Sequence, residues 1–529
     1  MLQSRRLFAL LNPMKMRLAF AAMLFCACLA PVVVMGQAKA TEKAPGKATE
    51  KAAAKAPSKS SETLGEWAAP VNFCTYPCLV GANAAVMNNG NILFYYYPAA
   101  GTLNSQAMVL NPVSGALTNV ALPVNEDIFC SGLSILENGN VIVEGGNITG
   151  TCDHTDGGAS GCGTTQVQIF NPSTSSWTTG TSMNYARWYP SDIELTDGTL
   201  LEVSGTDSTG QWVQTELESY NYNTTKWTVL PTSANLPSAV SQVYPRLTLL
   251  PTGNVFLSSP AEDSYQFNPI TNKWSFVAKV NFGYRYFAPH VLLPNGDIMV
   301  AGGSPSKLNG GSTATNTAEI INMSAAKPAW SYTSSMNYAR YNENLVLLAD
   351  GTVLAVGGGG GGGRYANPVL TAELYNPTTG QWSVMAAQTI QRTYHSTAVL
   401  IPDGRVVSAG SDNGAPTQVT YEIYSPPYLF NGARPVISSS PTSITYGSQF
   451  SITTANAATI ASVALVRPGA TTHADDFDQR YVNLTFTVGN GTLTATAPAN
   501  GNLAPPGYYM LVIVNTSGVP SVMPFLQLN

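Results

Sequence analysis

The feature that most constrains the fold of this chain is a unit of about fifty residues that recurs from residue 80 to residue 425. Each unit holds an apolar segment, a two-residue turn ending in glycine, and a second apolar segment that often ends in Gly-Gly. Such turns between apolar segments are strong signals for β-hairpins. The turns are Asn89-Gly90, Asn138-Gly139, Asp197-Gly198, Thr252-Gly253, Asn295-Gly296, Asp350-Gly351 and Asp403-Gly404.

A second hairpin closes most units, as in Phe267-Asn268-Pro269 followed by Trp274. The composition agrees with short strands and many turns, since 47 residues are glycine and only 10% are charged. Radial repetition of four-stranded units leaves only short, protected sheet edges. The sequence therefore predicts an all-β protein with a seven-bladed β-propeller of kelch type, over residues 64–432.

The repeat stops after Pro426-Pro427, and the remaining residues alternate apolar and polar side chains in short segments. This pattern predicts a C-terminal immunoglobulin-like β-sandwich over residues 433–529. The glycine run from Gly357 to Gly363 could suggest a phosphate-binding loop. Because no helix follows it, we interpret it as an extended Gly-Gly ending of one blade.

The N-terminus has the pattern of an export signal. Residues 1–17 are basic, Leu18 to Met35 are largely apolar, and small residues suited to signal-peptidase cleavage follow. We interpret residues 1–38 as a signal peptide or membrane anchor and residues 39–63 as an Ala/Lys/Pro-rich linker. Ser4-Arg5-Arg6 also leaves twin-arginine export open. We expect a secreted, periplasmic or cell-envelope protein, and a monomer.

The formal net charge of −5 conceals an uneven distribution. Residues 1–60 hold ten Lys/Arg and two Glu, so the remainder holds 15 basic and 28 acidic residues, a net charge of −13. A body of this sign would be repelled by phosphate backbones. We therefore expect no nucleic-acid partner.

Seven cysteines are distributed in an informative way. Cys26 and Cys28 fall inside the export signal. In an oxidising compartment, the remaining close neighbours could form two small disulfide loops, Cys74–Cys78 and Cys152–Cys162. That pairing leaves Cys130 alone, either buried and inert or used chemically.

Superimposing the repeats by their turns brings chemically reactive residues to one register position. Eight residues before each turn stand Gly81, Cys130, Tyr189, Tyr244, Phe287, Asn342 and His395, with Tyr394 just before the last. Equivalent positions in a propeller lie on a ring around one mouth of its channel. His473, in the C-terminal domain, could join this ring through a loop. Two His and two Tyr form a nitrogen and oxygen site suited to copper(II).

Several further motifs make the chain resemble the radical copper oxidases, namely galactose oxidase and the glyoxal oxidases, over residues 65–529. The motifs are Phe129-Cys130-Ser-Gly, Ala186-Arg-Trp-Tyr189-Pro, Arg392-Thr-Tyr394-His395-Ser, Tyr424-Ser-Pro-Pro-Tyr-Leu-Phe430, Thr472-His473 with Asp478-Gln-Arg480, and Pro506-Gly-Tyr-Tyr-Met with Gly518-Val-Pro-Ser521. The resemblance implies a galactose-oxidase-like early-set fold for the C-terminal sandwich.

For the site, the resemblance implies one copper ion held by Tyr189, Tyr394, His395 and His473. It also implies a thioether between Cys130 and Tyr189 that can hold a radical. Tyr394 would accept the substrate proton, and the Tyr189 radical would take hydrogen from carbon. The substrate would be a primary alcohol or a small aldehyde, and O2 would leave as hydrogen peroxide.

Two departures from galactose oxidase favour the glyoxal-oxidase-like branch. Asp207 stands where galactose oxidase places a tryptophan over the cross-linked ring, so Trp188, Trp212 or neither covers it here. Only the linker precedes Leu64, where galactose oxidase has a carbohydrate-binding domain. Residues that could form the substrate pocket are Tyr244, Arg246, Tyr286, His290 and Asn342.

Two other functions are weighed against the oxidase. A catalytically inactive kelch propeller could bind a glycan or a protein through the same channel mouth. A sialidase is disfavoured because the repeats lack Asp-box motifs and no arginine triad stands out.

Overall fold

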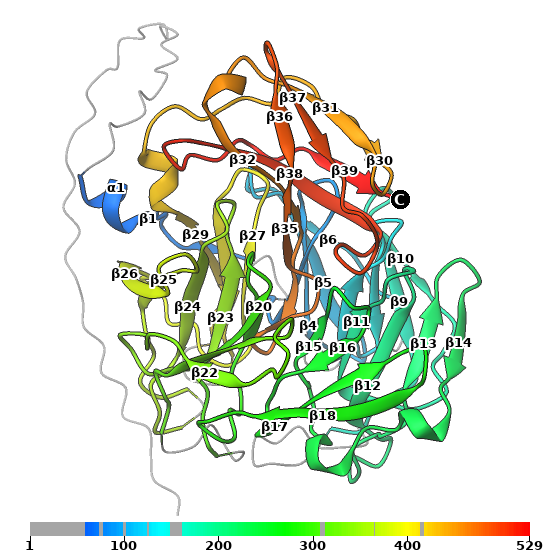
Figure 1. Ribbon diagram of the computed structural model, residues 1–529. Helices are drawn as coiled ribbons and strands as arrows, with labels where there is room; N and C mark the ends of the chain where they lie inside the picture. Colours follow the sequence, from blue (N-terminus) through cyan, green and yellow to red (C-terminus); the bar gives the residue numbers. More distant parts are fainter. Residues whose placement is uncertain are drawn as a thin grey trace, which may run out of the picture. The chain divides into compact units, whose positions relative to one another are not determined.

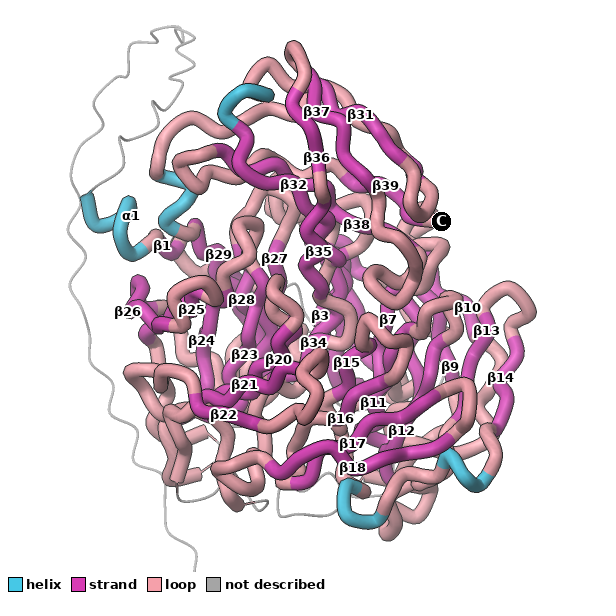
Figure 2. Tube along the Cα trace, in the orientation of Figure 1, coloured by secondary structure: helices cyan, strands magenta, loops and turns pink. Residues whose placement is uncertain are grey.

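The computed structural model describes residues 59–73, 78–98, 102–123, 126–148, 161–306, 313–363, 365–412 and 417–529, all of which fall within one compact unit. Strands dominate this unit, and its helices are short (Figures 1 and 2). None of the helices in the described part is long and apolar enough to cross a bilayer. The export signal and most of the linker lie outside the described residues, as do Cys74 and Cys152, so both disulfides stay predictions.

The all-β prediction is confirmed. In the described ranges, seven sheets each contain consecutive strands of one repeat, and we call these sheets blades 1 to 7. Blade 1 contains β3 (Asn83–Val86), β4 (Ile92–Pro98), β5 (Ser105–Leu110) and β6 (Leu117–Asn119). Blade 2 contains β7 (Gly132–Ile135), β8 (Val141–Glu144), β9 (Val167–Asn171) and β10 (Ser176–Thr179). Blade 3 contains β11 (Trp188–Glu194), β12 (Leu200–Thr206), β13 (Glu218–Asn221) and β14 (Lys226–Val229).

The next blades follow the same order along the chain. Blade 4 contains β15 (Leu247–Leu249), β16 (Val255–Leu257), β17 (Asp263–Asn268) and β18 (Lys273–Lys279). Blade 5 contains β19 (His290–Leu292), β20 (Asp297–Ala301), β21 (Ala318–Asn322) and β22 (Trp330–Tyr332). Blade 6 contains β23 (Tyr341–Leu347), β24 (Val353–Gly359), β25 (Thr371–Asn376) and β26 (Gln381–Ala387). The predicted turns join the first and second strand of each blade.

Blade 7 is completed from the other end of the propeller sequence. It contains β27 (Ser396–Leu400), β28 (Val406–Gly410) and β29 (Thr420–Ser425), and β29 pairs with β1 (Glu66–Trp67) and β2 (Val71–Asn72). The first strands also close a circle, because β27 of blade 7 lies against both β23 of blade 6 and β3 of blade 1. Pairing both ends of the repeat array within one sheet leaves no open seam.

The C-terminal residues form two facing sheets, as predicted for the sandwich. One sheet contains β30 (Ser443–Ile444), β32 (Ile460–Arg467), β35 (Arg480–Leu484), β38 (Gly507–Asn515) and β39 (Phe525–Leu528), and the other contains β31 (Gln449–Thr453), β36 (Phe486–Val488) and β37 (Thr492–Thr496). Their inner faces share an apolar core that includes Ile452, Leu465 and Leu511. The short helices are α1 (Lys59–Leu64), η1 (Thr232–Ala234), η2 (Ser238–Val240), η3 (Pro427–Phe430) and η4 (Ala457–Thr459).

A hairpin leaves the sandwich and enters the propeller. Its strands β33 (Ala470–Thr472) and β34 (Asp475–Asp476) join the sheet of blade 1, where β33 pairs with the first strand β3. We call residues 468–480 the finger. Finger side chains bond to first strands of further blades: Asp478 accepts from Ile135 N at 2.7 Å, and Gln479 Nε2 donates to Leu345 O at 2.8 Å. The finger is thus tied to blades 1, 2 and 6.

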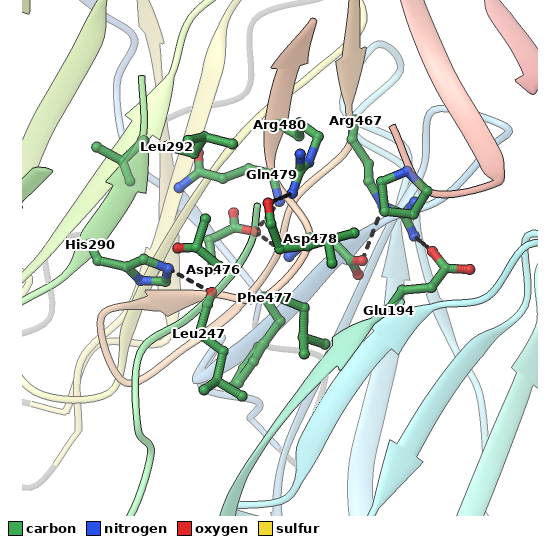
Figure 3. A pocket seen from close by; sticks show the side chains of 15 residues that line it. Glu194, Leu247, His290, Leu292, Arg467, Asp476, Phe477, Asp478, Gln479 and Arg480 are labelled. Carbon is green, nitrogen blue, oxygen red and sulfur yellow. Dashed lines mark hydrogen bonds and ion pairs between the residues drawn. The ribbon is translucent and has the colours of Figure 1, made fainter. Parts of the chain in front are cut away.

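A polar cavity lies beside the base of the finger. Figure 3 shows Arg467 pointing to both Glu194 and Asp478, while His290 on the opposite side donates from Nε2 to Leu247 O at 2.9 Å. None of the five residues predicted for the copper site lines this cavity. We therefore assign it to the packing of the finger against the propeller.

Buried ion pairs repeat from blade to blade. Arg187–Glu218, Arg285–Glu319, Arg340–Glu373 and Arg392–Glu422 are all fully buried, with N–O distances of 2.7 to 3.4 Å. Each arginine also donates to a carbonyl near the end of its blade's second strand, as Arg340 does to Gly357 O at 3.0 Å. Each arginine lies just before the first strand of its blade, so these contacts connect the segment that leads into the first strand to the second and third strands.

Breaking one of these pairs should be strongly destabilising. In Arg340→Met, Glu373 would remain buried without its cation, which typically costs about 3–5 kcal/mol. We expect a large fall in the urea midpoint of unfolding, followed by tryptophan fluorescence. Lys279→Met is the control, because Lys279 pairs with Asp263 at the surface and should change the midpoint little. Equal effects of the two substitutions would contradict this interpretation.

Candidate copper site

The predicted ring positions share one unusual backbone conformation. Cys130, Tyr189, Tyr244, Phe287, Asn342 and His395 all have φ between 47° and 62°, which non-glycine residues rarely adopt. Backbone hydrogen bonds connect neighbours around the ring: Tyr189 N donates to Cys130 O at 2.9 Å, and Tyr244 N to Tyr189 O at 3.0 Å. The register in the sequence thus corresponds to a real structural equivalence. Gly81, at the seventh position, is not among the residues with positive φ.

The finger brings His473 to this ring. His473 and Ala474 are the two residues between β33 and β34, with φ of 51° and 63°. A two-residue hairpin turn with both φ values positive is usually built from Asn-Gly, so His-Ala here is a strained choice. Arg246 supports the turn, since its guanidinium donates to His473 O at 3.1 Å and pairs with Asp475 at 3.1 Å.

Five side chains with nitrogen, oxygen or sulfur atoms meet at one point. Tyr189 Oη lies 2.5 Å from Tyr394 Oη and 3.0 Å from His473 Nε2, and Cys130 Sγ lies 3.7 Å from His473 Nε2. Ligand atoms of Cys130, His395 and His473 all lie within 4.8 Å of one another. All five side chains are at most 9% exposed. The structure therefore brings together every residue predicted for the site.

Two polar residues orient the histidines. His395 Nδ1 donates to Asp412 Oδ1 at 2.6 Å, and Tyr96 Oη donates to Asp412 Oδ2 at 2.7 Å. Beside the other histidine, Thr472 Oγ1 donates its only hydrogen to Ala82 O at 2.9 Å. The hydroxyl must therefore accept the hydrogen bond from His473 Nδ1 at 2.6 Å. Both rings thereby carry hydrogen on Nδ1 and present the Nε2 lone pair to the centre.

Aromatic rings enclose the centre. Trp188 stacks on Tyr189 with centroids 3.6 Å apart and planes 11° apart, and Tyr244 stacks on Tyr189 at 4.6 Å. Trp212 is 71% exposed. Of the alternatives left open by the sequence, Trp188 is therefore the tryptophan that covers the ring. Phe129 packs edge-on against His395 at 5.1 Å.

The donor set suits a metal ion. His395 Nε2 is buried and has no hydrogen-bond partner among the described residues, although its Nδ1 is held firmly. Burial raises the pKa of the Tyr189 phenol well above its usual value, so the phenolate needs a cation nearby to form. Imidazole nitrogens and phenolate oxygens in one buried cluster match the ligand preferences of copper(II).

The five residues predicted for a substrate pocket lie in different settings. Tyr244 and Asn342 are on the ring; Asn342 is buried, and its side-chain amide has no hydrogen-bond partner among the described residues. Arg246 and His290 both contact Asp475 of the finger, with His290 Nδ1 3.0 Å from Asp475 Oδ1. Tyr286 is half-buried and stacks on Tyr284. Arg246 and His290 therefore serve to hold the finger.

Sequence reasoning did not identify Asp412, Thr472 or Phe129 as parts of the site. Only Thr472 and Phe129 carried a signal, because they precede His473 and Cys130 directly. Asp412 lies 17 residues after His395 and meets it only because β27 and β28 pair, with Ser396 opposite Gly410.

Together the fold and this cluster define a class of protein: a propeller followed by a sandwich domain, whose finger completes a nitrogen and oxygen site beside the ring residues. Residues 105–428 match the family described as "Glyoxal oxidase N-terminus", and residues 434–528 match "Galactose oxidase-like, Early set domain". The chain belongs to the glyoxal oxidase family and is an oxidoreductase.

Individual relatives agree with this assignment. Galactose oxidase of Gibberella zeae is 28% identical over 500 residues, covering 87% of this chain and 70% of that protein. Aldehyde oxidase GLOX1 of Arabidopsis thaliana is 30% identical over 400 residues, covering 65% of this chain and 63% of that protein. A solved structure titled "Novel fungal alcohol oxidase with catalytic diversity among the AA5 family, in complex with copper" has a TM-score of 0.76 and 24% identity, covering 88% of this chain and 100% of that chain. At that identity the likeness shows the fold.

Removing the carboxylate behind His395 should weaken copper binding. In Asp412→Asn the amide can turn a donor toward His395 Nδ1, so the ring loses its fixed orientation. We expect affinity for copper(II) to fall about 10–100-fold, measured by competition with a chelator. Asn342→Ala is the control, because its side chain bonds to neither histidine. Unchanged affinity in Asp412→Asn would contradict the orienting role.

Proposed function

We propose that this protein is a copper radical oxidase that converts a primary alcohol or a small aldehyde to the next oxidation level and reduces O2 to H2O2. The observation that carries this proposal is the meeting of Tyr189, Tyr394, His395 and His473 around one buried point, with Cys130 beside them. Family membership supports the reaction class. These four side chains would hold one copper ion.

We further propose a thioether between Cys130 Sγ and a ring carbon of Tyr189. The two residues are neighbours on the ring, joined by the Tyr189 N to Cys130 O hydrogen bond, and they share one apolar cluster. Forming the bond removes the thiol hydrogen and one ring hydrogen. The two protons and two electrons would go to O2, giving H2O2.

Oxidation of an alcohol to an aldehyde removes two electrons and two protons. Bound copper would supply one of the two one-electron acceptors and a binding position for the substrate oxygen. The sulfur-substituted Tyr189 ring would supply the other, with Trp188 stacked on it. Tyr394 Oη, 2.5 Å from Tyr189 Oη, is placed to take the hydroxyl proton. The phenoxyl oxygen of Tyr189 would take the hydrogen atom from carbon.

The enclosure of the centre suits this chemistry. Trp188 and Tyr244 lie on Tyr189, and Phe129 lies against His395, so water has restricted access to the ring that carries the radical. This aromatic cover over Tyr189 favours small substrates. An oxygen-uptake screen over primary alcohols, small aldehydes and sugars would identify the substrate.

The cross-link can be tested without knowing the substrate. Intact mass should fall by two hydrogen masses after the purified apo protein receives copper and O2, and a peptide map should show Cys130 joined to Tyr189. Cys130→Ala should bind copper as the wild type does yet lose most peroxide production. An alkylatable Cys130 after copper loading, or unchanged turnover in Cys130→Ala, would contradict the radical mechanism. An inactive, copper-free protein that binds glycans would instead support the binding propeller.

Export remains part of the proposal. The basic and apolar N-terminal pattern supports a secreted, periplasmic or cell-envelope location, where copper and O2 are accessible. N-terminal sequencing of the protein recovered from the cell envelope or the medium would give the cleavage site. A chain that begins at Met1 in the cytoplasm would contradict it.

A further inference from the structure

A second cluster of potential ligands lies apart from the copper site, between blades 2 and 3. Glu144 on β8, Asp192 on β11 and Glu202 on β12 bring carboxylate oxygens within 4.8 Å of one another. Their exposed fractions are 0%, 1% and 0%. Asp192 and Glu202 stand directly opposite each other in one blade, while Glu144 reaches them from the neighbouring blade.

These carboxylates have no partner within the described part of the chain. All six side-chain oxygens are buried without a hydrogen bond, and none takes part in a salt bridge. The arginine that acts on Glu202 electrostatically is Arg187, and it is already paired with Glu218 at 3.3 Å. Burying even one unpaired carboxylate is strongly unfavourable. Three whose oxygens lie within 4.8 Å of one another therefore require a cation or protons.

The repeat shows that the cluster is specific to this interface. Counted from the turn glycine, the positions of the three acids are apolar in most other blades. The fifth residue after the glycine is Glu144 in blade 2, whereas other blades have Val203, Ala301, Val356 and Ala409 there. The fourth residue after the glycine is Glu202 in blade 3, whereas other blades have Val143, Leu257, Val300 and Ala355. The sixth residue before the glycine is Asp192 in blade 3, whereas other blades have Leu133, Leu247, Leu345 and Ala398. Packing the fold does not demand acids at these positions.

The backbone also leaves room for a ligand. Gly132, opposite Glu144 in blade 2, has no side chain, and a Cβ there would lie 2.8 Å from Asp192 Oδ2 and 3.5 Å from Glu144 Oε2. An unpartnered, fully buried Glu144 is thus aimed from one blade toward the Asp192–Glu202 pair of the next, across a space that a side chain would close.

We propose that Glu144, Asp192 and Glu202 bind a calcium ion that joins blades 2 and 3. Oxygen-only ligands indicate a hard cation, and three carboxylates that can each bind through two oxygens suit the six to eight ligands of calcium. Magnesium usually keeps several waters and takes fewer carboxylates. This site is independent of the proposed copper chemistry.

The ion would act next to the copper site. Gly132 lies two residues after Cys130, and Asp192 three residues after Tyr189. A cation that holds β8, β11 and β12 together would fix the spacing between β7, which begins two residues after Cys130 and pairs with β8, and β11, which contains Tyr189. In its absence, burial raises the pKa of Glu202 to about 8, and the carboxyls would hold protons instead.

Calcium content and thermal stability test the proposal on the full chain. Protein stripped of metals should regain one calcium ion per chain, measured by mass spectrometry of the elements, and its Tm should rise with calcium concentration. Glu202→Gln should lose both the calcium and the Tm response. In chelator, the same variant should be at least as stable as the wild type, because a buried glutamine is neutral without having to take up a proton.

Glu343→Gln is the matched control. Glu343 is also fully buried with both oxygens unpartnered, but it lies in blade 6 outside the cluster. It should keep the calcium ion and the Tm response. The proposal would be overturned if the wild-type Tm did not change with calcium or responded to magnesium alone. It would also be overturned if Glu343→Gln and Glu202→Gln lost calcium equally. Because apo protein is used, failure of the copper chemistry would leave these readouts unchanged.

Discussion

The arrangement of the site depends on a single backbone constraint, the left-handed conformation at the start of the first strands. Six non-glycine residues hold it, and such conformations cost of the order of 1–3 kcal/mol each unless the surroundings over-determine them. Here the surroundings do so. Hydrogen bonds run from ring residue to ring residue, and buried arginines anchor the chain two or three residues earlier. The cost is offset by the assembly of the blades.

The same constraint explains why blade 7 supplies two residues to the site. In blades 3, 5 and 6 the buried arginine stands two residues before the ring position, as Arg187 does before Tyr189. In blade 7 Arg392 stands three residues before His395, and Thr393 is the additional residue. Tyr394 then lies between the anchor and the ring and reaches Tyr189. One added residue therefore turns a packing position into a second phenol donor.

Much of this could be predicted from the sequence because it is periodic. Hairpin turns at regular spacing predicted the blades, and counting back from them found Cys130, Tyr189 and His395 without any contact information. What could not be predicted depends on pairing between distant segments. Asp412 meets His395 only through the register of β27 with β28, and Arg246 supports His473 across 227 residues of chain. Whether Trp188 covers the Tyr189 ring could not be decided from the sequence either, because stacking depends on a side-chain orientation that periodicity does not determine.

The finger shows how a chain with four histidines can still build a two-histidine centre. The propeller's ring offers one histidine at a position that every blade repeats, so symmetry alone cannot place a second one beside it. Pairing β33 with β3 brings in a strand from outside the repeat, and the strained His473-Ala474 turn places the imidazole against Tyr189. The contacts of Arg246 and Asp478 then resist withdrawal of the finger. The donor set is consequently complete only when both domains are folded together, which couples formation of the metal site to the packing of the entire chain.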